Sequence, residues 1–269
     1  MSASLDEILA ALTSFAPLAL AEPWDNVGLL LPGEGGATSV ERALFAIDLT
    51  EAVLDEAVDL EAELVVAYHP PLFEGIKRVD LATAAGRIVA RSLRHGIAVF
   101  SPHTSLDAVK GGINDWLADG VGDGDRRPLE QKLGAADGVG MGRLVSLDPP
   151  RALDAIVSDL KAHLGKRHLR VAPSRRHASG EPIGEVAICA GAGGSMFSKL
   201  GDVDLLFTGE MRHHDVLSRI ERGTSVVLAE HTGSERGYLP AYAREIEHRL
   251  AGRIETVVSR VDRDPLEVV

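Results

Sequence analysis

Histidines and carboxylates recur at the same short spacing in two segments of the chain. The segment SPHTSLDAVKGGINDWL places His103 four residues before Asp107, and LAEHTGSERG places His231 four residues before Glu235. Imidazole and carboxylate together are suitable ligands for zinc, iron, manganese or nickel, and a carboxylate can bridge two ions. An ion held in this way activates water near neutral pH and polarises a substrate oxygen. A salt bridge or a helix-capping pair is the alternative for each pair taken alone.

A third histidine stands at the end of an apolar run in the segment EAELVVAYHPPLFEGIK. This is His69, and Pro70 and Pro71 behind it fix the backbone and remove two hydrogen-bond donors. A stiff approach suits a metal ligand, and it also suits a plain loop. The companions of His69 therefore have to be sought elsewhere in the chain.

Strands and helices alternate along most of the sequence. Helical periodicity covers residues 5–15 and 51–62, whereas near-continuous apolar runs cover 43–50, 63–69 and 96–103. Buried apolar strands separated by amphipathic helices predict an α/β fold with mostly parallel or mixed sheets, covered by helices on both faces.

In α/β sheets of this kind, ligands bind beyond the carboxyl ends of the strands. The polar residues that follow the predicted strands are therefore the candidate site residues: His69, His103 with Asp107, Glu210, and His231 with Glu235. Histidines with a purely structural role have no reason to gather at strand ends. The pattern favours a metal site assembled from distant segments of the chain.

A glycine-rich segment, GAGGS, follows another predicted strand. The backbone amides of Gly191, Gly193, Gly194 and Ser195 could form a nest that binds an anion. The segment lacks the third glycine of GxGxxG and the lysine of a Walker loop, so neither nucleotide motif is met. A tight turn explains the same residues. The basic segment around Arg175–Arg176 is a second candidate for holding phosphate.

Composition and charge limit the partners. The 269 residues include 40 acidic and 28 basic side chains, for a formal charge of -12. A protein that binds long nucleic acid needs the opposite balance, although a small anion in a local basic pocket is not excluded. Cys189 is the only cysteine, which rules out an intrachain disulfide and a cysteine-based zinc site.

The two ends of the sequence and its middle suggest where it is located and how it is divided. The N-terminus has no basic region, and Ser4 and Glu7 have the spacing of a helix capping box. No apolar stretch reaches membrane-spanning length, so we expect a cytoplasmic protein without a membrane partner. A Gly- and Asp-rich stretch near 120–138 predicts a domain boundary. We expect a first domain of residues 1–125 completed by 225–269, and a second of residues 126–224.

Six segments, in order, resemble the GTP cyclohydrolase 1 type 2 family, also called Nif-three-like proteins: AEPWDNVGLLLPG, VVAYHPPLFEGIK, SPHTSLDAVKGGINDWLA, AICAGAGGSMF, DLLFTGEMRHHDVL and LAEHTGSERG. The likeness extends from Leu5 to the final predicted strand. It implies two α/β domains, a dinuclear divalent-metal site between them and a toroidal homohexamer. The reaction attached to the family is the opening of the GTP imidazole ring, and it does not extend to every member.

The resemblance also implies roles for individual residues. Its metal ligands correspond to His69, Asp107, His231 and Glu235, with Glu235 bridging two ions and His103 beside them as a neighbouring group or proton shuttle. The sequence departs from the family at Tyr68, where bacterial members with the fullest site have a second histidine. A phenol is a poor ligand unless deprotonated, because its usual pKa is near 10. We therefore expect one firm metal site and one that is weak, empty or completed by water.

Two functions of different classes follow. The first is a metal-dependent hydrolase acting on GTP or a related purine nucleotide, with one or two Zn, Fe, Mn or Ni ions per chain. His103 or Glu210 would move protons in this enzyme, and GAGGS or the Arg175–Arg176 segment would hold phosphate. The second is a non-catalytic metal-binding scaffold whose ring presents surfaces to partners. A phosphoesterase-like metalloenzyme is a third reading.

Overall fold

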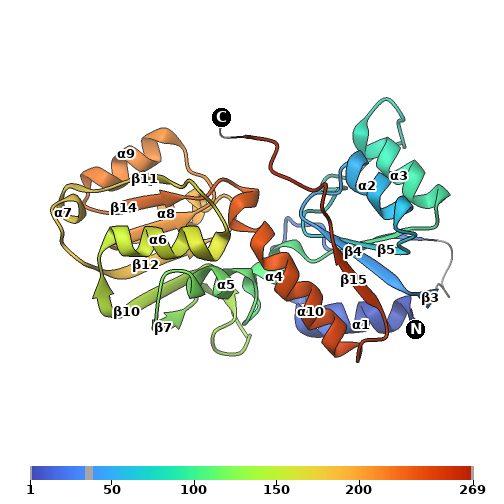
Figure 1. Cartoon of the computed structure of the whole chain (residues 1–269), viewed down its shortest axis with the longest axis horizontal. Coiled ribbons are helices and arrows are strands. Elements are labelled where there is room, and N and C mark those ends of the chain that lie inside the picture. Colours follow the sequence, from blue (N-terminus) through green and yellow to red (C-terminus); the bar gives the residue numbers. More distant parts are fainter. Residues whose placement is uncertain (1, 34–38, 268–269) are drawn as a thin grey trace. The chain divides into compact units, whose positions relative to one another are not determined.

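The computed structural model describes residues 2–33 and 39–267, and the chain divides into two compact units. The first consists of Met1–Leu106 with Tyr238–Val269, and the second of Asp107–Gly237. Figure 1 shows the course of the chain, coloured from its N-terminus to its C-terminus. Each unit contains a mixed sheet with helices on its faces, which confirms the prediction of two α/β parts with mostly parallel or mixed sheets.

The first unit contains a five-stranded sheet in the order β15-β4-β5-β6-β2. Strands β15, β4, β5 and β6 are parallel, and β2 pairs antiparallel with β6. The elements of this unit, in chain order, are β1 (Ala3–Ser4), α1 (Leu5–Phe15), η1 (Leu18–Leu20), β2 (Gly28–Pro32), β3 (Ser39–Val40), β4 (Arg42–Ala46), α2 (Glu51–Asp59), β5 (Leu64–Ala67), α3 (Ala84–Arg94), β6 (Ala98–Ser101), α10 (Leu239–Arg249) and β15 (Glu255–Val258). Two further elements, α4 (His103–Ala108) and η3 (Arg236–Tyr238), cross the boundaries of the units.

The two faces of this sheet follow from strand alternation. Leu44 and Val65 belong to a buried cluster that includes residues of α2 and α3. The neighbouring Phe45 points the other way, and its ring meets Tyr242 of α10 with centroids 5.5 Å apart. Successive side chains of a strand point to opposite faces, so an apolar run buried on both sides needs helices on both. Figure 1 shows α2 and α3 on one face and α1 and α10 on the other.

Helix α1 starts with the capping box that the sequence predicts, and helix α2 is capped by Thr50. The Ser4 side chain accepts from the Glu7 amide while Glu7 accepts from the Ser4 amide, which completes the capping box before α1. The Thr50 hydroxyl accepts from the Val53 amide at the start of α2. In the part of the chain that the structure describes, no helix has the length and apolar character that a bilayer crossing requires.

The second unit contains a six-stranded sheet in the order β11-β14-β13-β12-β10-β7. Strands β12, β13 and β14 are parallel, and β10 pairs antiparallel with both β12 and β7. Its elements are α5 (Ile113–Asp119), β7 (Gly124–Arg127), β8 (Glu130–Gln131), β9 (Gly140–Met141), β10 (Arg143–Arg151), α6 (Leu153–Leu164), β11 (Arg170–Ala172), α7 (Arg175–Ala178), β12 (Ile183–Cys189), α8 (Gly194–Ser198), β13 (Leu205–Thr208), α9 (His213–Glu221), β14 (Ser225–Leu228) and η2 (Thr232–Ser234).

The predicted domain boundaries, 125/126 and 224/225, both fall inside this second unit. Strand β7 begins at Gly124 and pairs with β10, so the Gly- and Asp-rich stretch forms part of the sheet edge. Strand β14 starts at Ser225 and is the parallel neighbour of β13. Glycine and aspartate mark turns at the ends of these strands, and such turns occur within domains as well as between them.

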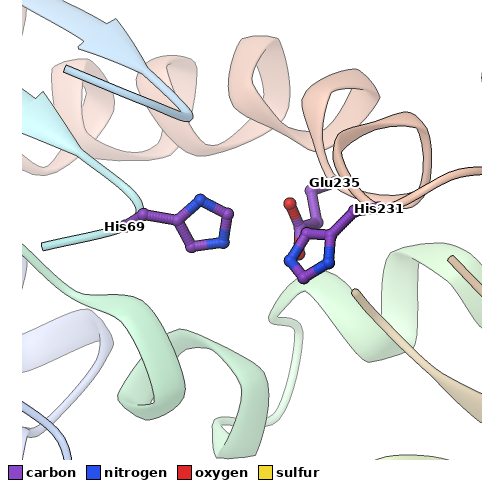
Figure 2. Close-up of side chains that lie close together, drawn as sticks. All are labelled: His69, His231 and Glu235. Atoms are coloured by element: carbon purple, nitrogen blue, oxygen red, sulfur yellow. The ribbon is translucent and has the colours of Figure 1, made fainter. Parts of the chain in front are cut away.

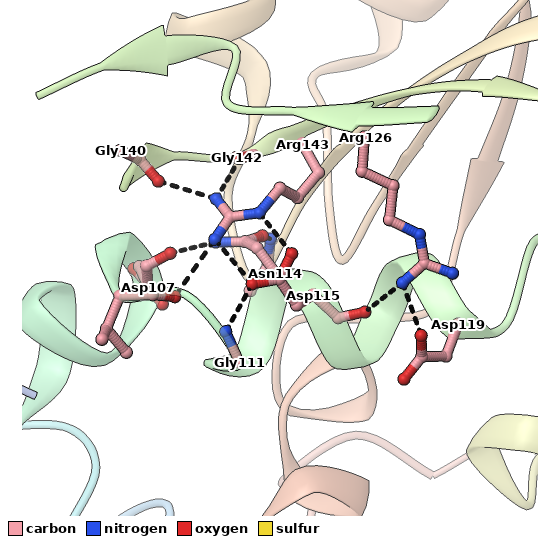
Figure 3. A network of polar contacts seen from close by, with 11 residues as sticks. Asp107, Gly111, Asn114, Asp115, Asp119, Arg126, Gly140, Gly142 and Arg143 are labelled. Carbon is pink, nitrogen blue, oxygen red and sulfur yellow. Dashed lines mark hydrogen bonds and ion pairs between the residues drawn. The ribbon is translucent and has the colours of Figure 1, made fainter. Parts of the chain in front are cut away.

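A buried arginine at the start of β10 holds the segment before α5 in place. Arg143 is 1% exposed, and its guanidinium donates in a fork to the two carboxylate oxygens of Asp115, at 2.6 and 2.9 Å. It also donates to the carbonyls of Gly140, Gly142 and Val109 (Figure 3). The fork satisfies a buried charge from several directions, which a buried ion pair requires if it is not to destabilise the fold.

Replacing Arg143 tests how strongly this network holds the unit together. We expect Arg143→Leu to lower the free energy of unfolding by about 3–5 kcal/mol, because the Asp115 carboxylate loses its fork and three carbonyls lose a donor. Arg126→Leu is the matched control, because Arg126 makes an ion pair with the exposed Asp119 (Figure 3). Both free energies of unfolding are measured by urea titration, and Arg126→Leu should lower this free energy by less than about 1 kcal/mol. Equal losses in the two variants would contradict the stabilising role of Arg143.

Candidate metal centre

His231 and Glu235 follow strand β14 and flank the short helix η2. The His231 Nε2 atom lies 3.5 Å from Glu235 Oε1, and Figure 2 shows the imidazole beside the carboxylate. Two ligands bound to one tetrahedral ion at about 2.1 Å each are separated by roughly 3.4 Å. The pair therefore has the separation of two ligands of a single metal ion.

Glu210, which follows strand β13, sets the orientation of the His231 ring. Its Oε1 lies 2.9 Å from His231 Nδ1. An ionised carboxylate only accepts hydrogen bonds, so Nδ1 carries the proton and Nε2 keeps a lone pair. Carboxylates hold metal-ligating histidines in this way in many sites. Glu210 is itself anchored, since its amide donates to the Gly191 carbonyl at 3.0 Å.

The glycine-rich segment after strand β12 lies against these two side chains. Gly191 has a φ of +61°, and a Cβ placed there would be 2.6 Å from Glu235 Oε1 and 3.1 Å from His231 Nε2. The Gly191 amide donates to Ser234 Oγ at 2.9 Å, and the Gly193 amide donates to Thr208 Oγ1 at 3.0 Å. These two amides are used within the protein, whereas Gly194 and Ser195 line a groove. Anion binding by the four residues stays a prediction.

Asn114 links Asp107 to the end of strand β12. Asn114 Nδ2 donates to the Asp107 carbonyl at 3.0 Å, and Asn114 Oδ1 accepts from the Ala190 amide at 2.9 Å. The neighbouring Cys189 thiol has a raised pKa, chiefly because it is buried and also because Asp107 and Glu235 place negative charge near it. Cys189 is therefore a protonated, apolar neighbour of the carboxylates.

In the first unit, His69 stands directly after strand β5. Its Nδ1 atom lies 2.9 Å from Asp48 Oδ1, so its ring has the same carboxylate orientation as that of His231. The His69 amide donates to the Ile47 carbonyl, which extends the pairing with β4 up to the histidine. Figure 2 draws the His69 side chain with both ring nitrogens. Tyr68 is buried beside it, with ring centroids 5.0 Å apart.

His103 begins helix α4 and lies in an aromatic cluster of the first unit. Its ring centroid is 5.3 Å from that of His69, 5.6 Å from Tyr68 and 6.0 Å from Trp24. Its Nδ1 atom lies 2.7 Å from Asp25 Oδ1. Burial raises the pKa of Asp25, but hydrogen bonds from His103 and Thr104 outweigh it and hold that pKa below its usual value. Asp25 is therefore ionised at neutral pH and orients the imidazole.

The structure brings some of the predicted residues together within each unit. Tyr68, His69 and His103 form one group in the first unit, and Glu210, His231 and Glu235 form another in the second. Arg176 of the predicted basic segment is engaged elsewhere, since it makes ion pairs with Glu181 and Asp204.

Three residues that support these groups escaped the sequence reasoning: Asp48, Asn114 and Ser234. Asp48 carried a usable signal, because it follows a buried strand as His69 does. Asn114 and Ser234 act through hydrogen bonds to the backbone of distant segments, and no local pattern marks such bonds.

Comparison with known proteins decides the family. The model of the family described as Duf34/NIF3 (NGG1p interacting factor 3) matches residues 3–265. The chain belongs to this family. It is 39% identical to the NIF3-like protein 1 of Drosophila melanogaster, over 98% of this chain and 89% of that protein. It is 36% identical to the NGG1-interacting factor 3 of Saccharomyces cerevisiae, over 99% and 97%. The resemblance to Nif-three-like proteins is thereby confirmed.

Solved structures of NIF3-related proteins share the fold. A Bacillus cereus protein related to NIF3 has a TM-score of 0.85 at 19% identity, covering 99% of both chains. The reduced HcgD of Methanocaldococcus jannaschii has a TM-score of 0.79 at 22% identity, covering 96% of this chain and 98% of the other. At such identities the likeness establishes the NIF3 fold of the chain and leaves its chemistry to its own residues.

The close approach of Gly191 to the two candidate ligands makes a test. Gly191→Ala places a methyl group against Glu235 and His231 and puts alanine in a left-handed conformation, which costs about 1–2 kcal/mol. We expect its affinity for added zinc, measured by competition with a chromogenic chelator, to fall about 10–100-fold. Gly194→Ala is the control, because no atom lies within 4 Å of the position that its Cβ would take and its φ is not positive. Unchanged zinc affinity in Gly191→Ala would refute the proposed contact.

Proposed function

We propose that this NIF3-family protein binds divalent metal through His69, His231 and Glu235. The three side chains offer two ring nitrogens and one carboxylate oxygen, a donor set that suits zinc, iron, manganese or nickel. Asp107 and Glu235 are the proposed ligands of a second ion. Family membership supports the proposal. It rests mainly on the orientation of the His69 and His231 imidazoles.

The observation that carries it is the same in both units. His69 and His231 each have a carboxylate 2.9 Å from Nδ1, contributed by Asp48 and Glu210 respectively. With the proton held on Nδ1, the Nε2 lone pair of each ring is the metal-binding position. Glu235 lies at ligand spacing from one of these Nε2 atoms. Both histidines have a carboxylate at Nδ1 that orients the imidazole. This repeated arrangement favours metal binding over isolated salt bridges.

We further propose that the protein is a hydrolase acting on GTP or a related purine nucleotide. A divalent ion in this donor set supplies Lewis acidity and water activated near neutral pH. His103 is the proposed proton carrier, because Asp25 fixes its Nδ1 proton and leaves Nε2 to accept or deliver another. Glu210 has a positioning role through His231, and a direct catalytic role for Glu210 stays a prediction.

Tyr68 makes the two metal positions unequal. An ion held by His69, His231 and Glu235 would have two imidazole ligands, whereas an ion held by Asp107 and Glu235 would have none, because Tyr68 stands where the resemblance implies a further histidine. A phenol with its usual pKa near 10 gives up its proton only at a cost at neutral pH. We therefore propose one firmly bound ion and a second that is weak or completed by water.

A non-catalytic binding role is the second candidate. The yeast relative is named NGG1-interacting factor 3, which says of that protein that it interacts with another protein. In this reading the chain forms a ring-shaped homohexamer whose surfaces bind partners, and its metal takes part in no reaction. Partner binding that survives the loss of metal favours this reading, and turnover of nucleotide favours the hydrolase.

Metal analysis of the purified protein tests the proposal. We expect one ion per chain after mild chelation, and Tyr68→His should raise this number toward two by supplying the missing imidazole. His231→Ala and Glu235→Ala should each retain less than about a tenth of the bound metal. His168→Ala is the control, because His168 is exposed and lies outside the two groups. Two tightly bound ions in the unaltered protein, or full retention in His231→Ala, would refute it.

Turnover is tested separately on protein whose metal content is known. Metal-loaded protein is incubated with GTP while the purine absorbance is followed. A rate that falls at least 100-fold in His103→Ala, with metal content unchanged, supports the hydrolase and the role of His103. A fully loaded protein without turnover on GTP or other purine nucleotides would favour the scaffold.

A further inference from the structure

The second unit contains a groove of about 820 Å³ that the proposed metal site does not use. Its walls come from the end of the glycine-rich segment, from helix α8, and from the start and one side of helix α9. Its lining residues are Ala192, Gly194, Ser195, Phe197, Ser198, Glu210, Met211, Arg212, Asp215, Ser218, Arg219 and Arg222. The volume lies in the range of small-molecule sites, which is about 300–1,000 Å³.

Three arginines line the groove, and two of them have structural partners. Arg219 is buried and donates to the Phe197, Leu200 and Gly201 carbonyls at the end of α8, so it fixes α8 against α9. Burial and the nearby Arg222 lower the pKa of Arg219. Arg222 donates to Asp202 at 2.6 Å. Both cations are therefore committed to holding the groove in shape.

Arg212 is the third arginine and differs from the other two. It immediately precedes α9 and is exposed. Among residues 2–33 and 39–267, its guanidinium has no hydrogen-bond or ion-pair partner. Of the acidic lining residues, Glu210 is engaged with His231, which leaves Asp215. Three arginines and two carboxylates line the groove in a chain whose net charge is -12, and Asp202 offsets the charge of Arg222.

We propose that this groove binds the phosphate of a phosphomonoester, with Arg212 as its main cationic contact. A guanidinium fork matches phosphate oxygens, and the Ser195 and Ser218 hydroxyls lining the groove add donors from other directions. A tetrahedral dianion accepts from several directions, whereas a planar carboxylate accepts mainly in one plane. Arg212 thus becomes a specificity-determining residue to which no role was assigned from the sequence.

Glu210 connects the groove to the candidate metal centre. It lines the groove and at the same time holds Nδ1 of His231. A phosphate on Arg212 would therefore place the rest of the molecule beside the residue that orients a metal ligand. The identification of the groove as a substrate site rests on the proposed function, whereas phosphate binding itself does not.

Calorimetric titration of metal-free protein separates the two claims, because phosphate cannot then bind through a metal. The probes are ribose 5-phosphate, inorganic phosphate and malonate, and the variants are Arg212→Gln and Arg167→Gln. Arg167 is an exposed arginine of the same unit that does not line the groove. We expect the ribose 5-phosphate affinity to fall at least tenfold in Arg212→Gln and to stay unchanged in Arg167→Gln. Malonate should bind at least tenfold more weakly than ribose 5-phosphate.

Each outcome decides one claim. No binding of the phosphate probes by the unaltered protein, or equal affinity in Arg212→Gln, would overturn the groove proposal. Equal affinity for malonate would overturn its specificity for phosphate. The zinc content of Arg212→Gln is measured in parallel and should equal that of the unaltered protein. Phosphate binding that depends on Arg212 in a chain that binds no metal would support the groove and refute the metal centre.

Discussion

The pairing of an imidazole with a carboxylate at the end of a parallel strand is the interaction on which the candidate chemistry depends. It occurs three times, between His69 and Asp48, His103 and Asp25, and His231 and Glu210. In each pair the carboxylate belongs to the same unit as the histidine. Each unit therefore prepares its own rings, selecting the tautomer and aiming Nε2, before any ion binds.

This preparation explains features that look unrelated in the sequence. Gly191 must lack a side chain because Glu235 and His231 occupy the space where its Cβ would be. Ser234 accepts from the Gly191 amide and donates to the His231 carbonyl, so one hydroxyl holds both segments at a fixed separation. Thr208 does the same for the other side of the loop, because it accepts from Gly193 and donates to the Gly191 carbonyl. The loop packs against the Glu235 and His231 side chains, and two of its amides make the hydrogen bonds that hold it in place.

The sequence predicts most of the fold because its strands are apolar on both faces and its helices are capped locally. It also predicts that His69, His103 and His231 follow buried strands, because a polar residue after an apolar run is a local signal, whereas their role as ligands or proton carriers stays a prediction. It does not predict the unit boundaries, since β7 and β14 pair with strands that are distant in the chain. The hydrogen bonds of Asn114 to Asp107 and Ala190 are long-range in the same way. The Gly- and Asp-rich composition near 120–138 indicates turns. The pairing of β7 with β10 shows that these turns belong to the second unit.

The second unit shows how one carboxylate serves two purposes. Glu210 lies at the Nδ1 atom of His231, and it also lines a groove that contains three arginines. The groove and the His231 ring therefore share a single carboxylate side chain. A ligand that placed its phosphate on Arg212 would lie beside the carboxylate that orients a proposed metal ligand, which is how a distant substrate group can influence a reacting centre.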